Sequence, residues 1–531
     1  MLAPEKTLRD RSGGHQDTSE RQGRSIRQIG ECEMKNPDQL LTHRFASLLS
    51  ALLLITGLAY ATQPGKPATA ATLSNADQVK ACSFTQADKW WQQPATSLPS
   101  SVANNPVTGD PQFCEFYQFA QEWFLYLISP SAQAGVANWQ DRSQYPLLEI
   151  SGNSCDSTTV KRALRIRTVK SLDDSGDVVL PERVDQAGAE AIYDQAGNVV
   201  FYEIHFSRNL CDYASIQAQS NFPGKTAELK LAWRVMQEDD DQDSFILSKA
   251  TIDGQEYTLG LIGWHIVVSA DNHPEMVWFT LDHKNNAIDC ADIGKSATAY
   301  DFTSASCAAD ATKCQNLNQT QEFTTVSLPS GQRGNDVCQE YPYGTVEGDS
   351  IDTRNGLNIA LIQKLNAAQE ELFQQAGLPA SLAVWENYEF TGALWISDIK
   401  QGSGSASGDA TNQRGSLELA NVVMETQFQG NAASGSSAVN CFACHNYTGT
   451  ADSASKPNTA FSAHLSHIFD DVILGQCKDV ASSILINDQA QAEATCPGVC
   501  APNADFSKWN GQWTNQDKPM TVCGCCPDAV K

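Results

Sequence analysis

Cysteine is the residue that most constrains how this chain can fold. The sequence of 531 residues contains 17 cysteines, and in an oxidising compartment such a number cross-links a chain into fixed loops. An apolar run at 45–61 follows Arg44 and ends in Ala59-Tyr60-Ala61, the small-x-small pattern at which signal peptidase cuts. We therefore expect an exported protein, periplasmic or extracellular, that contains disulfide bonds.

The alternative for this apolar run is a membrane anchor. A spanning helix needs about 20 strongly apolar residues, whereas residues 45–61 are fewer and include serine, threonine and glycine. We expect cleavage after the run, so that residues 1–61 are a leader and the mature chain is not an integral membrane protein. A signal peptide begins near its start codon, which makes Met34 the expected translation start. Residues 62–77 are expected to form a linker.

The acidic composition limits the class of partner. The formal net charge is −26 and the sequence pI is near 4.6, so phosphate backbones would be repelled and nucleic acid is not an expected partner. Hydrophobic residues make up 41% of the chain, which is enough to form sizeable buried cores.

The hydrophobic pattern predicts an α+β fold with an antiparallel β-sheet and helices. Alternating residues favour strands at 199–207, 228–236, 257–270 and 276–283. Aromatic residues at helical spacing favour a buried helix over 113–128. Apolar residues three and four apart favour a helix over 355–377 that ends at Gly377.

Two shorter segments give weaker signals. Residues 417–427 have the pattern of a short helix. The acidic run 238–243 invites comparison with a calcium loop, but it lacks the turn glycine and the last glutamate of an EF-hand. We expect a solvated hairpin tip there.

The sequence Cys441-Phe-Ala-Cys444-His445 carries the clearest chemistry. Two thiols at this spacing reach the two vinyl groups of one porphyrin, and the following imidazole can bind the iron. A zinc site would need two further ligands nearby, and a thiol redox motif does not require the histidine; a plain disulfide is the other alternative. The motif predicts one covalently attached haem c, with Cys441 and Cys444 as thioethers and His445 as the proximal ligand.

The sequence does not determine the second axial ligand of the haem iron. A histidine, a methionine or a vacant position would each give different haem chemistry. The candidates are His265, His283, Met424, His464 and His467.

The order of motifs along residues 78–480 is similar to that of an uncharacterised family of large exported bacterial monohaem proteins of the cytochrome c family. The similarity lies in the segments QFAQEWFLYL, AELKLAWRVM, GWHIVVSADNHPEMVWFTLDHKNN, LWISDIKQ, ELANVVMETQFQ and NCFACHN. The chain departs from the family pattern at Leu281-Asp282-His283, where Phe-Glu-His is usual. The resemblance implies that the haem motif belongs to a large mixed domain. It implies no substrate.

The last 50 residues are rich in cysteine and tryptophan. Residues 484–531 are expected to form a small unit held by disulfides, because a core of this size rarely suffices alone. Candidate half-cystines are Cys496, Cys500, Cys523 and Cys525, and Cys307 with Cys314 is a plausible short loop elsewhere. Trp509 and Trp513 stand among amides and a hydroxyl, a pairing suited to sugars, although at least one of the two rings is expected to fill the core.

The succession CPGVC, WNGQWT and MTVCGC over 484–526 resembles the mannan-binding lectin module of the cyanobacterial lectin type. The resemblance implies a mannose-containing glycan as partner. It implies a glycan-binding site made of Trp509, Gly511, Gln512, Trp513, Thr514 and Asn515.

Two function classes follow. The first is an exported haem protein, for electron transfer with a redox partner protein or as a haem-dependent oxidoreductase, that is localised to glycan by its C-terminal module. The second is a lectin in which haem is structural or sensory. A di-haem peroxidase is disfavoured by the single motif, and no carboxylate pair marks a glycosidase.

Overall fold

The computed structural model describes, with internal gaps, residues 73–146, 191–398 and 412–445, three short strands between 163 and 179, and a C-terminal unit between 478 and 526. The predicted signal run lies outside the described residues, as do His464, His467, Cys444 and Asn515. Helix α1 (Asn75–Ala81) begins inside the predicted linker.

A ten-stranded sheet forms the centre of the large domain, and its described strand pairs are all antiparallel. The strand order is β12-β11-β8-β7-β5-β4-β1-β2-β3, with β6 paired to β7. The strands are β1 Ala163–Ile166, β2 Ser171–Asp173, β3 Val178–Val179, β4 Phe201–Phe206, β5 Ala227–Val235, β6 Leu247–Ile252, β7 Gln255–Ala270, β8 His273–His283, β11 Tyr388–Ile396 and β12 Gln413–Gly415.

The four strands predicted from alternation are β4, β5, β7 and β8, and they are consecutive neighbours in this sheet. The prediction of a mixed fold of helices and antiparallel sheet is therefore confirmed. The sixteen-residue β7 is the longest of them. It pairs with β5 along one edge and, on the other, with β6 near its start and with β8 farther along.

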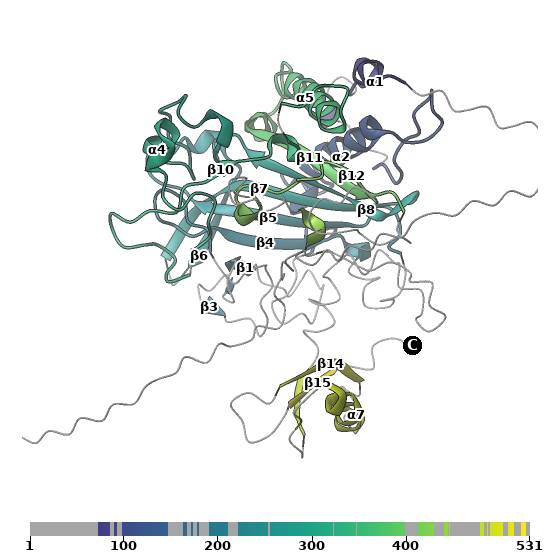
Figure 1. Cartoon of the computed structure of the whole chain (residues 1–531), viewed down its shortest axis with the longest axis vertical. Helices are drawn as coiled ribbons and strands as arrows, with labels where there is room; N and C mark the ends of the chain where they lie inside the picture. Colours follow the sequence, from purple (N-terminus) through teal and green to yellow (C-terminus); the bar gives the residue numbers. More distant parts are fainter. Residues whose placement is uncertain are drawn as a thin grey trace, which may run out of the picture.

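One face of the sheet is aromatic and covered by helices. Figure 1 shows α1, α2 (Phe113–Ile128) and α5 (Arg354–Phe373) gathered on one side of the sheet. Fully buried Phe124 of α2 meets Trp264 of β7 and Trp385 edge-on, at centroid distances of 6.1 and 5.4 Å. Burial of these large rings drives the helices onto the sheet.

The opposite face carries polar residues and is covered by the segment 412–445. Lys230, His265 and Thr280 stand side by side there, because Lys230 is the cross-strand partner of His265, which also pairs with Thr280. Trp278, two residues before Thr280, shares this face. A smaller apolar cluster that includes Val422, Val423 and Met424 packs on the same side.

Three local predictions need correction. The predicted helix at 355–377 is α5, but it ends at Phe373; Gly377, at φ +84°, lies in the turn that follows. The segment 417–427 is not an α-helix. It is a run of turns that enters the 3-10 helix η9 (Thr426–Phe428), and its buried Asn421 bonds to Thr280 and to the Leu281 carbonyl and ties it to the sheet.

The acidic run 238–243 is not a hairpin tip, since β5 and β6, which it joins, both pair with β7 and not with each other. It contains the start of the short helix η3 (Gln242–Ser244). Asp240 turns inward to Arg234, at 3.0 Å.

Disulfides brace the large domain, as the cysteine content predicted. They join Cys82 to Cys114, Cys290 to Cys338 and Cys307 to Cys314.

The remaining described elements of the large domain are short. Strand β9 (Ile288–Asp289) is parallel to β10 (Cys338–Gln339). The others are the helices α4 Ala305–Ala309 and α6 Ala380–Ala383 and the 3-10 helices η1 Trp90–Gln92, η2 Asn138–Gln140, η4 Cys290–Asp292, η5 Ala311–Lys313, η6 Pro342–Gly344, η7 Val384–Asn387, η9 Thr426–Phe428 and η11 Cys441–Ala443.

The C-terminal unit is a helix packed on a three-stranded antiparallel sheet. It comprises β13 (Lys478–Ala481), α7 (Gln489–Cys500), β14 (Lys508–Thr514) and β15 (Val522–Cys526), in the sheet order β13-β15-β14. Disulfides join Cys496 to Cys523 and Cys500 to Cys525. Positions four apart on a helix and two apart on a strand each share one face, so the two bonds run in parallel.

These half-cystines also form most of the apolar core among the unit's described residues. The buried cluster consists of Ile486, Ala492, Cys496, Cys500, Cys523 and Cys525. Pro497 and Gly498, both poor helix formers, lie inside α7. The disulfides therefore hold a helix that its own sequence supports weakly. Within the described part of the chain, no helix is long and apolar enough to cross a membrane.

Candidate functional site

The Cys441–His445 motif begins in a tight turn fixed by a buried asparagine. The Asn440 amide donates to the Gln413 side chain and to the Leu417 carbonyl, both at 2.7 Å, and its oxygen accepts from the Phe442 amide at 3.0 Å. The His445 amide then bonds to the Cys441 carbonyl at 3.0 Å. This i to i+4 bond places Cys441 and His445 one turn apart on the same side.

Cys441 differs from the other described cysteines. Among the cysteines whose side chains the structure describes, it alone is outside a disulfide, and it is partly exposed. Desolvation, followed by the charge of Glu425, raises the pKa of its thiol to about 12. Reactive cysteines have lowered pKa values, so at neutral pH this thiol is protonated and is not a prepared nucleophile.

Trp278 of β8 forms the surface against which the motif packs. Its ring lies 4.5 Å from the His445 ring and 5.8 Å from that of Phe442, centroid to centroid. The buried Trp278 Nε1 has no hydrogen-bond acceptor among the described residues. An unsatisfied buried donor beside the motif is the kind of group that a bound polar ligand would satisfy.

A charged cluster of His265, Glu425 and Lys230 lies on the same face of the sheet as Trp278. His265 Nε2 lies 2.8 and 3.0 Å from the two carboxylate oxygens of Glu425, and Lys230 lies 3.8 Å from Glu425. Both Glu425 and Lys230 act electrostatically on Cys441. The three side chains are only partly exposed, which strengthens their mutual attraction relative to a surface pair.

The candidate axial ligands are placed differently from one another. His265 shares the face of the motif, with its Nε2 engaged by Glu425. His283 lies at the end of β8, where Nε2 donates to the Ser244 carbonyl and Nδ1 accepts from the Asn285 amide. Burial lowers the pKa of His283 to about 4. Met424 is buried in the apolar cluster of the motif-bearing face.

No group of three His, Cys, Asp or Glu side chains in the described chain could hold a bare metal ion.

Sequence reasoning missed Trp278, Glu425 and Asn440. Alternation in β8 carried a signal for Trp278, because it places this residue on the face opposite Val277 and Phe279. Glu425 meets His265 across 160 residues, and no spacing rule anticipates such a contact.

The predicted glycan-binding residues from Trp509 to Thr514 lie along strand β14, whereas Asn515 lies outside the described residues. Trp509 pairs with Cys525 and Trp513 with Cys523, so the residues between the two tryptophans stand opposite Gly524 alone. This irregularity is a bulge, a feature that redirects side chains and is frequent next to functional sites. Trp509 is partly buried and packs against the disulfide-rich core. In the three-stranded sheet, β14 is an edge strand.

Comparison with known proteins gives one match, in this C-terminal unit. Residues 489–525, from α7 into β15, match the family model of the mannan-binding protein MVL. The match supports a C-terminal lectin module and hence a carbohydrate-binding unit. No curated protein matches the chain, and no solved structure does. The resemblance of residues 78–480 to the cytochrome c family stays a prediction.

Proposed function

We propose that the chain is an exported glycan-binding protein whose C-terminal unit attaches it to mannose-containing glycans. The observation that carries this proposal is the family match over 489–525. Disulfide bonds of the kind seen here are typical of proteins that fold outside the cytosol, which supports a periplasmic or extracellular location.

The backbone of β14 supports the proposed position of the glycan site. Trp509 anchors one end of the WNGQWT segment in the core, and the bulge carries Asn510, Gly511 and Gln512 on an edge strand. Aromatic rings beside amide groups suit sugars, because sugar CH faces pack on rings while sugar hydroxyls need hydrogen bonds. We expect Trp513, Thr514 and Asn515 to complete the site.

Binding of the full-length protein to immobilised mannan tests this proposal. Gln512→Ala should weaken the binding at least tenfold, whereas Gln133→Ala, which removes an exposed amide in the large domain, should leave it unchanged. Full-strength binding by the Gln512→Ala protein, or no binding by the unaltered protein, would count against the proposed site.

The second candidate function is that of a haem protein, and one observation favours it. Cys441 lacks a disulfide while the other described cysteine side chains are paired. Its turn brings it to the same side as His445, and the unsatisfied Trp278 Nε1 lies beside them. These contacts support a covalently held haem c, in which Cys441 and Cys444 would form the thioethers and His445 would be the proximal ligand.

Such a group would supply one-electron redox chemistry. Trp278 and Phe442 would exclude water from one side of the His445 ring, and Glu425 would hold His265 in one orientation. A redox partner protein would complete an electron-transfer role, and a substrate would make the chain a haem-dependent oxidoreductase.

A haem-stained denaturing gel tests attachment in a host that matures c-type cytochromes. The unaltered chain should stain, and Cys441→Ala and Cys444→Ala should each lose normal attachment while mannan binding persists. Two intact thioethers in either variant would refute the assignment. A stained protein whose haem shows no electron transfer would instead favour the lectin alternative, in which haem is structural or sensory.

A further inference from the structure

A small acidic pocket lies between helix α5, the short helices η6 and η7, and the start of strand β11. Its volume is about 200 Å³, below the range usual for drug-sized ligands, so only a small ligand fits. The polar side chains that line it include Gln369 and Glu370 of α5, Glu386 of η7, Glu389 of β11 and Lys284, which follows β8.

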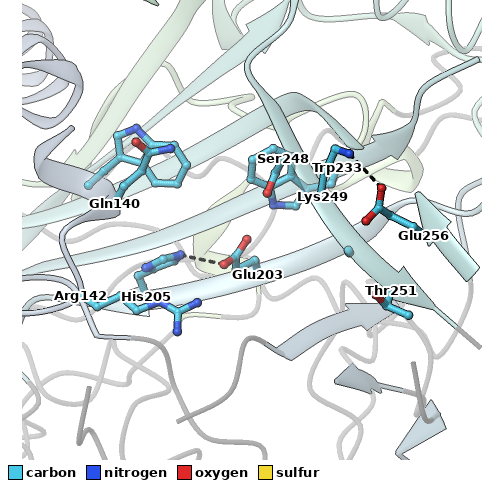
Figure 2. A pocket seen from close by; sticks show the side chains of 11 residues that line it. Gln140, Arg142, Glu203, His205, Trp233, Ser248, Lys249, Thr251 and Glu256 are labelled. Atoms are coloured by element: carbon cyan, nitrogen blue, oxygen red, sulfur yellow. Dashed lines mark hydrogen bonds and ion pairs between the residues drawn. The ribbon is translucent and has the colours of Figure 1, made fainter. Parts of the chain in front are cut away.

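A larger pocket, of about 430 Å³, lies beside strand β4 and is shown in Figure 2. There Glu203 lies 3.2 Å from His205, and Glu256 lies 2.8 Å from Lys249. Both carboxylates of the larger pocket therefore already face basic side chains, and a cationic ligand would have to compete with them. The pocket beside α5 differs, because it contains carboxylates without basic partners.

Gln369 distinguishes the pocket beside α5 from a gap in the packing. It shares the core-facing side of the helix with Leu361, Leu365 and Leu372, which lie three or four residues apart, and it is 3% exposed. Its buried Oε1 has no hydrogen-bond donor among the described residues. A buried amide oxygen without a donor destabilises a protein, and a leucine would continue the apolar side of the helix without this penalty. A ligand with N–H donors would satisfy the oxygen.

The charges around the pocket favour a cation. Lys284 lies 3.7 Å from Glu370, and both side chains are about half exposed, so these two charges offset each other. Glu386 and Glu389 line the same pocket and form no ion pair within the described part of the chain. Glu389 accepts a hydrogen bond from the neutral Asn366 amide at 3.3 Å, which leaves its charge uncompensated. Two unmatched carboxylates attract a positively charged ligand.

We propose that this pocket binds the ammonium group of a small aliphatic amine. Such a group has three N–H donors, and the pocket offers three acceptors, the Gln369 oxygen and the carboxylates of Glu386 and Glu389. A bare metal ion is a poorer fit, because no three His, Cys, Asp or Glu side chains of the described residues could hold one. The proposal rests on neither the C-terminal unit nor the haem motif.

Three small probes, titrated into the full-length protein by calorimetry, separate charge from hydrogen bonding. Butylammonium has a charge and N–H donors, tetramethylammonium has the charge alone, and 1-butanol has one donor and no charge. Butylammonium should bind saturably, and the other two should bind more weakly by about tenfold or more. The proposal is overturned if butylammonium does not bind or if tetramethylammonium binds as tightly.

Gln369→Leu tests the buried amide with two readouts. It should weaken butylammonium binding by about tenfold or more, and it should raise the unfolding temperature of the unliganded protein by about 2 to 4 °C, because the unsatisfied oxygen is gone. Gln374→Leu, which changes an exposed glutamine just after the same helix and outside the pocket, should alter neither quantity. A stabilised Gln369→Leu protein that binds as the parent does would overturn the proposal.

Glu389→Gln tests the charge, because the new amide keeps an acceptor for Asn366 but is neutral. Butylammonium binding should again weaken by about tenfold or more. Glu371→Gln, an exposed carboxylate of α5 outside the pocket, should have no effect. Equal affinities of the Glu389→Gln and parent proteins would refute the site. Failure of mannan binding or of haem attachment would leave this result unaffected.

Discussion

The Arg234 guanidinium lies 3.2 Å from the Asp301 carboxylate at the buried end of β5. Asp194 and Asp240 contact the same guanidinium, at 3.4 and 3.0 Å. One positive charge therefore faces three carboxylates, and full ionisation would leave an uncompensated negative charge inside the protein. Desolvation is the main cause that raises the pKa of Asp194 to about 6 and that of Asp301 to about 7.

This cluster should make the protein less stable as pH rises from 6.5 to 8. The folded state keeps protons that the unfolded chain, with carboxyl pKa values near 4, has already lost. The stabilisation is complete below about pH 4 and disappears as pH rises through 6 and 7. Urea unfolding at pH 6.5 and pH 8 should differ by about 1 kcal/mol, most of it from Asp301. Below pH 6.5 the low pKa of His283 acts in the opposite direction.

Asp301→Asn should reduce this pH dependence, because the amide does not titrate. Asp292→Asn, an exposed carboxylate paired with Lys295, serves as the matched control and should keep the full slope. Equal slopes in the Asp301→Asn and unaltered proteins would show that another group is responsible.

Removal of the Cys496–Cys523 bond should unfold the C-terminal unit. In the chain-entropy description, a loop of this length contributes roughly 3 to 4 kcal/mol, and the sequence separation is 27 residues. The Cys496→Ser/Cys523→Ser protein should lose mannan binding and become sensitive to protease near α7. Cys307→Ser/Cys314→Ser, which opens a bond in the large domain, should bind mannan normally. Persistent binding without the first bond would contradict its structural role.

Phe124→Ala should destabilise the large domain by about 3 to 5 kcal/mol, the usual cost of deleting a buried aromatic ring. Phe124 is fully buried and meets Trp264, Trp385 and Phe373. Thermal unfolding followed by near-ultraviolet circular dichroism would measure the change. Glu371→Ala on the exposed side of α5 should cost less than about 0.5 kcal/mol. Similar unfolding temperatures for the two variants would mean that α2 contributes little to the core.

Asn440→Ala should loosen the turn that carries the haem motif. The substitution leaves the Phe442 amide without its acceptor and removes two further bonds, a loss worth about 1 to 3 kcal/mol. We expect a lower unfolding temperature and a smaller fraction of chains with covalent haem. Asn104→Ala, an exposed control, should change neither quantity. Unchanged haem content with lowered stability would separate the turn's structural role from its role in attachment.

Much of the sheet could be predicted because β4, β5, β7 and β8 alternate in residue type, and a strand turns successive side chains to the two opposite faces of the sheet, both of which are covered here. The helix predicted over 417–427 was wrong because the apolar residues of this segment are buried by turns that pack on the sheet, so their helical spacing does not reflect a helix. The end of α5 was also misplaced, since the glycine signal at Gly377 belongs to the next turn.

The site was less predictable than the fold. The motif at Cys441 is local, so its residues could be read directly from the sequence. Its surroundings depend on tertiary contacts, and the approach of His265 to Glu425 is settled by how the segment 412–445 packs on the sheet.

The core of the C-terminal unit links this unit's fold to the place where the protein matures. Four of the six buried residues in its described apolar cluster are half-cystines, so we expect oxidation to be needed for that core to form. A chain held back in the reducing cytosol would carry the lectin sequence without a folded lectin. Under the proposed function, mannan binding would therefore require export to an oxidising compartment. A chain retained in the cytosol would not bind mannan.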